Sequence, residues 1–230
     1  MRSFSRLALP MALSVVLGAG ATDAIAGAKL ANPPARTQIA AVAAVALTED
    51  DRAEIRRIER YFNALRSIRA RFVQISDTGR YAEGKLFFVR PDKLRFEYEP
   101  PVKLLVVANG GWITQYDGDM KQANRFPIIN TPLQFLTKQQ ISFTSEVTIT
   151  ALERSAGVIR IEVVETKDPS TGRLTLTFSR EPMELRKWTV VDQQGTTVNV
   201  ALFNAEMNAE INPELFIYRD PSGGDPGKGN

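Results

Sequence analysis

The sequence predicts a mainly β (α+β) fold: a single, highly curved antiparallel sheet that forms an incomplete barrel, with helical pieces closing its open side. Three observations lead to this expectation. Segments of alternating apolar and polar residues recur along the chain, and roughly ten to twelve of them are predicted strands. Turn residues such as Asn-Gly and Asp-Pro separate these segments, which is typical of antiparallel pairing. Two segments with helical spacing interrupt the strands, and we find no nucleotide-type glycine loop and no internal repeat.

The composition is that of an ordinary soluble globular protein of 230 residues, with 43% hydrophobic and 24% charged residues. The formal net charge of +3, without a run of basic residues, gives no reason to expect a nucleic-acid partner. The chain contains no cysteine and no histidine. This excludes disulfides, thiolate nucleophiles, histidine general bases, Cys/His zinc sites and acylation at a lipobox cysteine. We expect no cofactor and no metal.

The N-terminus has the pattern of a secretory signal peptide. Arg2 and Arg6 give it a positive start, and an apolar run follows over residues 7–20. Small residues favour cleavage after position 26, which gives a signal peptide of residues 1–26, while residues 19–21 offer a second cleavage option. The apolar run is too short for a comfortable transmembrane helix. We therefore expect an exported, soluble protein, located in the periplasm if the source has two membranes.

The rest of the chain divides into three parts. Residues 27–47 are predicted to be a flexible leader, although the apolar run 39–47 could extend the following helix. Residues 48–219 are expected to form a single folded domain. The Gly/Pro-rich residues 220–230 are predicted to be a disordered tail.

The folded domain is predicted to begin with an amphipathic helix. The Thr48 hydroxyl can cap its first turn, and the acidic residues that follow favour the positive end of the helix dipole. Its apolar face is expected to hold Ile55, Ile58, Phe62, Leu65 and Ile68. Its basic face holds Arg56, Arg57, Arg60 and Arg66. This basic face is either simply solvated or contacts anionic lipid or a membrane partner.

The strands follow in two groups, separated by a short helix that Thr131-Pro132 is expected to start and that ends near residue 138. The predicted strands of the first group are 70–75, 84–89, 93–99, 102–108, 112–116 and 120–126. Those of the second group are 147–152, 158–166, 173–179, 185–192 and 196–203, with a last short strand at 215–218.

The clearest strand pair lies within residues 84–101, where a turn at 90–92 joins two strands. In the second strand Leu94, Phe96 and Tyr98 point to one face, and charged residues point to the other. The first strand is apolar on both faces, so we expect each side of it to be covered. The pair therefore presents one apolar, aromatic face to the interior.

Charged side chains near this pair leave two interpretations open. Arg90, at the junction of the apolar surface and the turn, could pair with Glu97 or Glu99 on the surface. The carboxylates of Glu97 with Glu99, and of Asp117 with Asp119, share strand faces and could serve a secreted hydrolase. A solvated sheet face is the simpler explanation of both carboxylate pairs.

Seven short motifs, taken together and in order, resemble the LolA family, the periplasmic carriers of outer-membrane lipoproteins. They are Arg69-Ala70-Arg71-Phe72-Val73-Gln74, Gly84-Lys85-Leu86, Arg90-Pro91-Asp92-Lys93-Leu94-Arg95-Phe96-Glu97-Tyr98, Pro100-Pro101, Ala108-Asn109-Gly110, Tyr116-Asp117 and Thr131-Pro132-Leu133. The resemblance covers about residues 50–218. It implies an incomplete β-barrel with a helical lid over a hydrophobic cavity, and a carrier rather than an enzyme.

The resemblance also implies roles for individual residues. The arginine that acts as a gate in the family corresponds to Arg90, and its guanidinium is expected to donate to lid carbonyls near Phe62, Leu136 and Thr137. Leu94 departs from the family, which often has an aromatic residue there. The expected cargo contacts are Phe62, Leu65, Ile68, Phe72, Leu86, Phe88, Leu94, Phe96, Tyr98, Trp112, Leu133 and Leu136. Periodicity alone does not tell whether these residues line a ligand cavity or fill a core.

The resemblance implies a monomer that accepts acylated lipoproteins from an inner-membrane LolCDE-type complex. It would deliver them to an outer-membrane LolB-type receptor, or directly to the membrane. A related alternative is a LolA-like periplasmic carrier or sensor of another lipid or glycolipid.

Overall fold

The computed structural model describes residues 44–220, which form an 11-stranded antiparallel sheet with two α-helices and three short 3-10 helices. The predicted signal peptide, residues 27–43 of the predicted leader and residues 221–230 of the predicted tail lie outside the described residues. Within residues 44–220, no helix has the length and apolar character needed to cross a membrane.

The strands form two groups, one before and one after α2, and helix α1 precedes them. The helices are α1 (Glu49–Ala64), η1 (Ile128–Asn130), α2 (Gln134–Thr137), η2 (Pro169–Thr171) and η3 (Pro213–Phe216). The strands before α2 are β1 (Ser67–Ser76), β2 (Tyr81–Val89), β3 (Lys93–Tyr98), β4 (Leu104–Asn109), β5 (Trp112–Asp117) and β6 (Gln122–Pro127). The strands after α2 are β7 (Val147–Ser155), β8 (Val158–Glu165), β9 (Arg173–Arg180), β10 (Met183–Val191) and β11 (Thr197–Met207).

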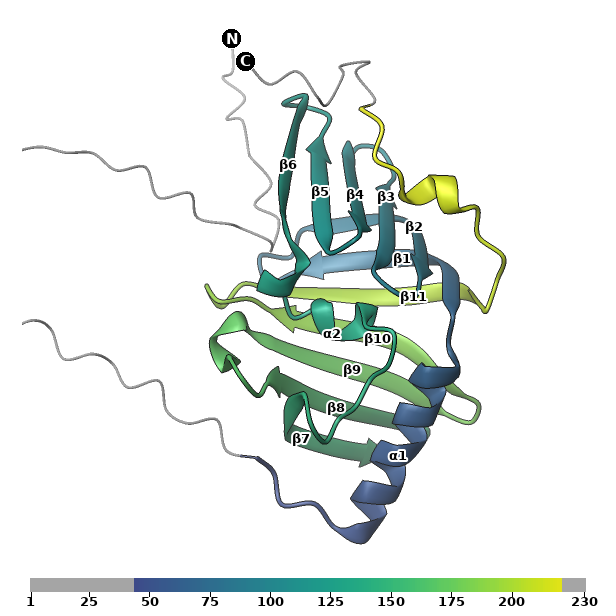
Figure 1. The fold of residues 1–230 in the computed structure, drawn as a ribbon, viewed down its shortest axis with the longest axis vertical. Helices are drawn as coiled ribbons and strands as arrows, with labels where there is room; N and C mark the ends of the chain where they lie inside the picture. The colour runs from purple at the N-terminus through teal and green to yellow at the C-terminus, as the bar shows by residue number, and fades with distance from the viewer. Residues whose placement is uncertain (1–43, 221–230) are drawn as a thin grey trace, which may run out of the picture.

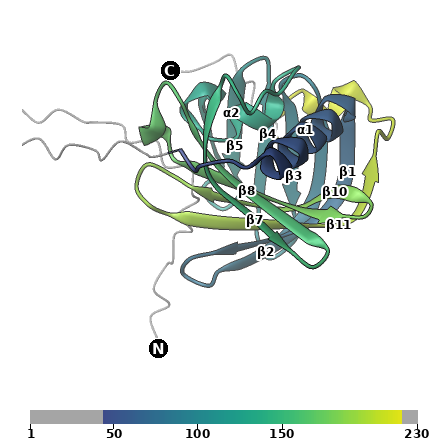
Figure 2. The same cartoon turned by 90° about the horizontal axis from the view of Figure 1, so that it is seen from below.

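The sheet consists of two meanders joined at its centre. Its strand order is β6-β5-β4-β3-β2-β1-β11-β10-β9-β8-β7, so β1 pairs with β2 on one side and with β11 on the other. The two edge strands, β6 and β7, do not pair with each other, and the sheet curves without closing (Figures 1 and 2). This confirms the predicted incomplete antiparallel barrel.

Alternation along the strands places one face of the sheet in the core. In β2, Leu86 and Phe88 are only 1% and 5% exposed, whereas their neighbours are half-buried or exposed. The β4–β5 turn has Gly110 and Gly111 at φ 58° and 81°, which is the left-handed backbone that such a tight turn requires. Both helices lie over the concave face of the sheet (Figure 2).

The first helix begins where the sequence predicted. The Thr48 hydroxyl accepts a hydrogen bond from the Asp51 amide, and the Asp51 carboxylate accepts from the Thr48 amide, so a complete capping box starts α1. On the face toward the sheet, Ile55, Ile58 and Phe62 are at most 3% exposed. The helix is therefore a fixed part of the core.

Two local predictions were wrong. Residues 215–218 are not a strand: Pro213 starts η3, and the Asn212 side chain accepts from the Glu214 amide to cap it. The predicted helix start at Thr131 is also absent, because the Thr131 hydroxyl donates back to the Ile128 carbonyl and ends η1. As a result α2 has only four residues, Gln134–Thr137.

The segment around η3 covers the convex face of β3 and β4. Arg95 donates to the Leu215 carbonyl at 2.9 Å, and Asn109 donates to the Phe216 carbonyl at 3.2 Å. Phe216 is 1% exposed, and Val107 in β4 is 2% exposed. The first meander is therefore covered on both faces at this point.

Candidate functional site

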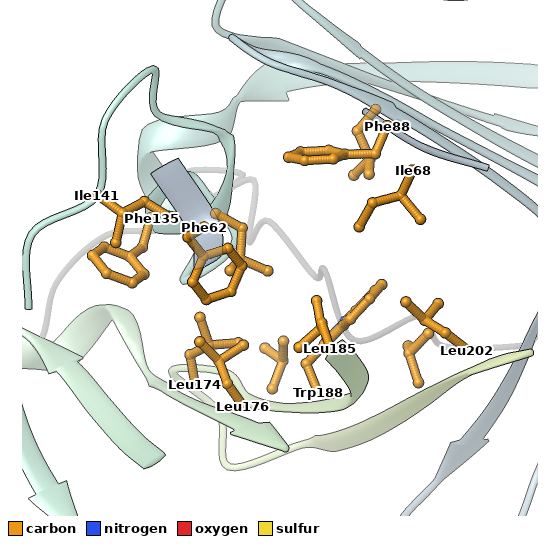
Figure 3. Packing of buried hydrophobic residues seen from close by; sticks show 14 of the residues in the cluster. Phe62, Ile68, Phe88, Phe135, Ile141, Leu174, Leu176, Leu185, Trp188 and Leu202 are labelled. Carbon is orange, nitrogen blue, oxygen red and sulfur yellow. The ribbon is translucent and has the colours of Figure 1, made fainter. Parts of the chain in front are cut away.

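A small apolar cavity lies between the two halves of the sheet and beneath the lid, which we define as η1, α2 and the following loop (residues 128–143). Its volume is about 30 Å³. The residues that line it are Phe62, Leu65, Ile68, Leu86, Phe88, Leu94, Leu133, Leu136, Thr137, Leu185 and Trp188. Figure 3 shows Ile68 and Phe88 from the first meander facing Leu185 and Trp188 from the second, with Phe62 beside them.

The size of this cavity indicates a closed state. A cavity of about 30 Å³ has room for only a few water molecules. An acyl chain contains many methylene groups and does not fit into it. The side chains of the lid must therefore move away from the sheet before the cavity could take up such a chain.

Arg90 lies at the end of β2, beside this cavity. Its Nη1 donates to the Phe62 carbonyl of α1 at 2.8 Å. Its guanidinium carbon lies 5.3 Å from the Phe62 ring centre and 5.8 Å from that of Phe88, within cation–π range. The surface pairs considered from the sequence do not form, because Glu97 pairs with Arg95 and Glu99 pairs with Arg71.

The Arg90 guanidinium is only partly satisfied. Its Nε and Nη2 atoms are buried and have no hydrogen-bond partner among the described residues. Burial lowers the pKa of Arg90 to about 10, so the side chain remains charged at neutral pH. A buried cation with unpaired donors destabilises the state that holds it. Arg90 thus stabilises the closed state through its hydrogen bond to the Phe62 carbonyl and destabilises it through the burial of unpaired donors.

The turn after Arg90 connects the sheet to the lid. The Arg90 amide donates to the Arg66 carbonyl, just beyond α1, at 2.9 Å. The Asp92 amide donates to the Thr137 carbonyl, at the end of α2, at 2.9 Å. The expectation that Arg90 itself donates near Leu136 and Thr137 is therefore not met: the left-handed backbone of Asp92, with φ 61°, turns the Asp92 amide toward that carbonyl instead.

The loop that follows α2 is tied to α1. Asn63 donates from Nδ2 to the Ile141 carbonyl at 3.1 Å and accepts from the Ile141 amide at 2.9 Å. The Glu59 carboxylate accepts from the Phe143 amide at 2.7 Å. The lid is therefore held at its C-terminal end by side chains of α1.

Most of the expected cargo contacts line the cavity, and four do not. Phe72, Phe96 and Tyr98 pack on one another, with the Phe72 ring centre 5.0 Å from those of the other two. The Tyr98 hydroxyl donates to Gln74, and burial raises the pKa of Tyr98. Trp112 is 44% exposed and lies under the guanidinium of Arg125. The roles of the twelve residues in cargo binding remain predictions.

Sequence reasoning did not place Thr137, Leu185 and Trp188 at the cavity. The sequence predicted the strand 185–192 that carries Leu185 and Trp188, but nothing in it showed that this strand faces Leu86 and Phe88 across a cavity. That pairing depends on how the two meanders curve toward each other. Long-range curvature of this kind leaves no local signal in the sequence.

The carboxylate pairs considered for hydrolysis are engaged elsewhere. Glu97 and Glu99 form ion pairs with arginines of the strands, at 2.6 and 2.9 Å. The Asp117 carboxylate accepts from the Asp119 and Met120 amides within a turn. Among residues 44–220, no group of three or more acidic side chains comes close enough together to hold a metal ion.

The comparisons with known proteins bear on this lidded cavity. The family model described as outer membrane lipoprotein carrier protein LolA matches residues 63–219. The chain belongs to the LolA family. Membership in the LolA family agrees with both the open antiparallel sheet and the helical lid.

Individual relatives of the LolA family are distant in sequence. An outer-membrane lipoprotein carrier protein of Pseudomonas aeruginosa is 25% identical over 185 residues, covering 76% of this chain and 88% of that protein. The carrier protein of Chromohalobacter salexigens is 27% identical over 150 residues, covering 63% and 70%. A solved LolA superfamily structure from Nitrosomonas europaea covers 71% of this chain and 97% of that one, with 7% identity and a TM-score of 0.41.

A second, larger hollow competes with the lidded cavity as a candidate site in this LolA-family chain. This open groove of about 620 Å³ lies between the residues before α1, α1 itself and the start of β7. Charged side chains of Arg52, Arg56 and Glu59 contribute to its lining. The lidded cavity has an almost wholly apolar lining, which suits acyl chains better, since burial of apolar surface needs no directional partners.

Proposed function

We propose that the protein is a periplasmic carrier that accepts acylated lipoproteins released from the inner membrane and takes them to the outer membrane. The observation that supports this most is the small, lidded apolar cavity beside Arg90, which lies beneath a short segment with few directional contacts to the sheet. In this proposal the cavity expands by lid movement, and the acyl chains of the cargo occupy it.

The physical demand on such a carrier is large. Exposure of an acyl chain to water costs about 0.8 kcal/mol for each methylene group, or tens of kcal/mol for a full lipid anchor. Leucine and phenylalanine side chains such as Leu86, Phe88 and Leu136 shield the chains without demanding one geometry. A carrier must also release its cargo, so some term must favour the empty, closed state.

Arg90 supplies that term in this proposal. A hydrogen bond from a charged donor contributes about 1.5–3 kcal/mol when it is well made. The β2–β3 turn also holds α2, through the bond from the Asp92 amide to the Thr137 carbonyl. The bond from Arg90 to the Phe62 carbonyl forms only when this turn lies against the fixed helix α1, so it favours closure. Cargo binding favours the open form and the Arg90 hydrogen bond favours the closed form, so the two shift the same equilibrium in opposite directions. The unpaired Nε and Nη2 atoms keep the closed state from becoming too stable to open.

Export and the partners belong to the same proposal. The predicted signal peptide, residues 1–26, would deliver the chain to the periplasm. A LolCDE-type complex would supply the lipoprotein, and a LolB-type receptor or the membrane itself would accept it. The carrier would act as a monomer, without a cofactor and without catalysis.

A carrier or sensor of another lipid or glycolipid is the second candidate. The apolar lining favours it equally, because the lining recognises acyl chains and offers few polar groups that would select a headgroup or a protein. The two candidates differ in whether a polypeptide leaves the membrane together with the lipid.

The experiment adds residues 27–230 to spheroplasts or inner-membrane vesicles that hold labelled lipoprotein. The proposal expects the lipoprotein in the supernatant as a soluble one-to-one complex with the carrier. If the lipoprotein stays in the membrane while the protein still extracts free lipid, the lipoprotein assignment is wrong and the second candidate stands. Failure to extract either would contradict both.

A further inference from the structure

An exposed apolar patch lies at one end of the first meander. We define this rim patch as Trp112, Arg125 and Ile129. Trp112 and Ile129 are 44% and 57% exposed, which is high for large apolar side chains. Pairing of β5 with β6 sets Trp112 opposite Pro127, two residues before Ile129, and the Ile128 amide donates to the Gly111 carbonyl at 2.9 Å. The β4–β5 turn and η1 are thereby held together.

The patch carries positive charge that nothing nearby neutralises. The Arg125 guanidinium carbon lies 4.7 Å from the Trp112 ring centre. No ion pair among the described residues includes Arg125. The chain from residue 121 to residue 145 contains Lys121, Arg125 and Lys138 and no acidic residue. Lys138 is paired with Glu146, and Lys121 precedes β6 at the end away from Trp112. The charge of Arg125 is therefore the one that the patch presents to a partner.

The patch is continuous with the lid. Ile128 is 5% exposed and belongs to the core, and Leu133, five positions further along the chain, lines the cavity. Figure 1 shows that β6 leads directly into the segment that carries α2, at the end of the strands next to the lid. A surface that binds the rim patch would therefore lie beside the lid.

We propose that the rim patch docks the protein on the surface of a phospholipid bilayer that contains anionic lipids. Tryptophan favours the membrane–water interface, because its ring is apolar and its N–H can remain hydrated. A basic side chain near an anionic surface is attracted to the lipid phosphates. An exposed isoleucine can enter the boundary between headgroups and acyl chains. The patch combines these three groups, and its charge is complementary to that surface.

Docking itself does not depend on the cargo. A role of docking in lipid transfer does rest on the proposed carrier function, since docking would place the lid against the membrane that gives or receives the acyl chains. The test below uses vesicles without lipoprotein, so its failure is separate from a failure of the release experiment.

The test measures binding of residues 27–230 to vesicles of phosphatidylcholine with and without phosphatidylglycerol. The chain has two tryptophans, and the other, Trp188, lies in the cavity wall. In a Trp188→Phe background the fluorescence therefore reports Trp112 alone. The proposal expects a blue shift of its emission with anionic vesicles, and quenching by lipids brominated along the acyl chain near the headgroup.

Three variants assign the effect to the patch. Trp112→Ala and Ile129→Ala, measured by sedimentation with vesicles, should each weaken partitioning by about tenfold, the loss expected for one apolar side chain. Arg125→Gln should weaken it by about fivefold, and only for anionic vesicles. Phe203→Ala is the matched control, since Phe203 is 50% exposed but lies on β11, away from the lid.

The outcomes separate clearly. Equal binding of the wild type, Trp112→Ala and Ile129→Ala would overturn the proposal, as would a loss of binding in Phe203→Ala of the same size. Absence of vesicle binding would also overturn it, and would leave a polypeptide as the partner that the patch fits. All four substitutions are at exposed positions, so far-ultraviolet circular dichroism should remain unchanged and confirm that the variants fold.

Discussion

Helices α1 and α2 cover the same concave face, yet they are held there by different forces. α1 is fixed to the sheet by directional bonds: the Tyr61 hydroxyl accepts from the Leu185 amide at 3.0 Å, Arg57 donates to the Arg180 carbonyl, and Asp51 pairs with Arg154. α2 has no side-chain cap, and one backbone hydrogen bond, from Asp92 to Thr137, joins it to the sheet.

Apolar contacts supply the rest of the attachment of α2. Phe135 and Leu136 are 7% and 8% exposed and pack on the core. Such contacts are non-directional, so an acyl chain could replace them with little loss, whereas no acyl chain could replace the hydrogen bonds of α1. In the proposed carrier we therefore expect α1 to act as the frame and α2 to be the part that moves.

The largest expected effect is a difference in the free energy of unfolding between a core truncation in α1 and one in α2. Ile58→Ala, at a position that is 0% exposed in α1, should lower the free energy of unfolding by about 3–4 kcal/mol, because a rigid site cannot collapse around the lost volume. Leu136→Ala in α2 should cost only about 1–2 kcal/mol, because the lid can settle onto the sheet. Urea unfolding of both variants measures the difference, and equal losses would argue against a movable lid.

The hydrogen bonds between α1 and the loop after α2 should make the next largest contribution to the free energy of unfolding. Asn63→Ala removes both hydrogen bonds between the Asn63 side chain and the backbone of Ile141. Ile141 is 3% exposed, so its amide and carbonyl groups are left buried and unpaired. We expect a loss of about 2–3 kcal/mol in the free energy of unfolding. Hydrogen exchange at the Ile141 amide should become faster in this variant while exchange within α1 remains slow. Uniformly faster exchange in both would show that the two helices open as one unit.

Arg90→Leu tests the contact between the frame and the turn. The Phe62 carbonyl also accepts from the Leu65 amide at 3.1 Å, so it keeps a partner when Arg90 is lost. The free energy of unfolding should fall slightly, because loss of the charged hydrogen bond to the Phe62 carbonyl outweighs the relief of no longer burying a partly unpaired cation. Cargo should be retained and its delivery slowed by about tenfold, which corresponds to loss of one charged hydrogen bond. Delivery at the normal rate would refute the gate role, and Arg90→Lys serves as the charge-preserving control.

The cap of α1 should have the smallest effect. Thr48→Ala should cost about 1 kcal/mol. Hydrogen bonds from Thr48, then the charge of Arg154, lower the pKa of Asp51. A lowered pKa means that the stabilisation is present above the ordinary carboxyl pKa and is lost as pH falls through the lowered value. Thermal unfolding between neutral and acidic pH should thus show a flatter acid limb in Thr48→Ala than in the wild type.

The fold followed from the sequence because its signals are local. Alternation and turn residues placed most of the strands, and Thr48 marked the start of α1. The segment 215–218 was mistaken for a strand because four apolar residues in a row carry no helical or strand period. The resemblance implied that Trp112 contacts cargo, but the neighbouring Ile113, 1% exposed, occupies the inward position and Trp112 is 44% exposed.

The site was harder to predict than the fold. The resemblance, and not the residue pattern, pointed to the Arg90 contact with Phe62. Phe72, Phe96 and Tyr98 carry the same alternation as Leu86 and Phe88, yet the first three fill a core and the last two line the cavity. Which residues meet the lid depends on the curvature of eleven strands, and that is a property of the whole sheet.

The most direct test of lid movement is a reversible crosslink between the lid and the sheet. The Asp92 amide and the Thr137 carbonyl lie 2.9 Å apart, and the chain has no cysteine, so Asp92→Cys with Thr137→Cys introduces the only thiol pair. Release of labelled lipoprotein from inner-membrane vesicles is measured for the oxidised and the reduced forms, with each single variant as control. We predict that the oxidised form releases at least about tenfold less lipoprotein and that reductant restores release. Equal release by the oxidised and reduced forms would contradict the account.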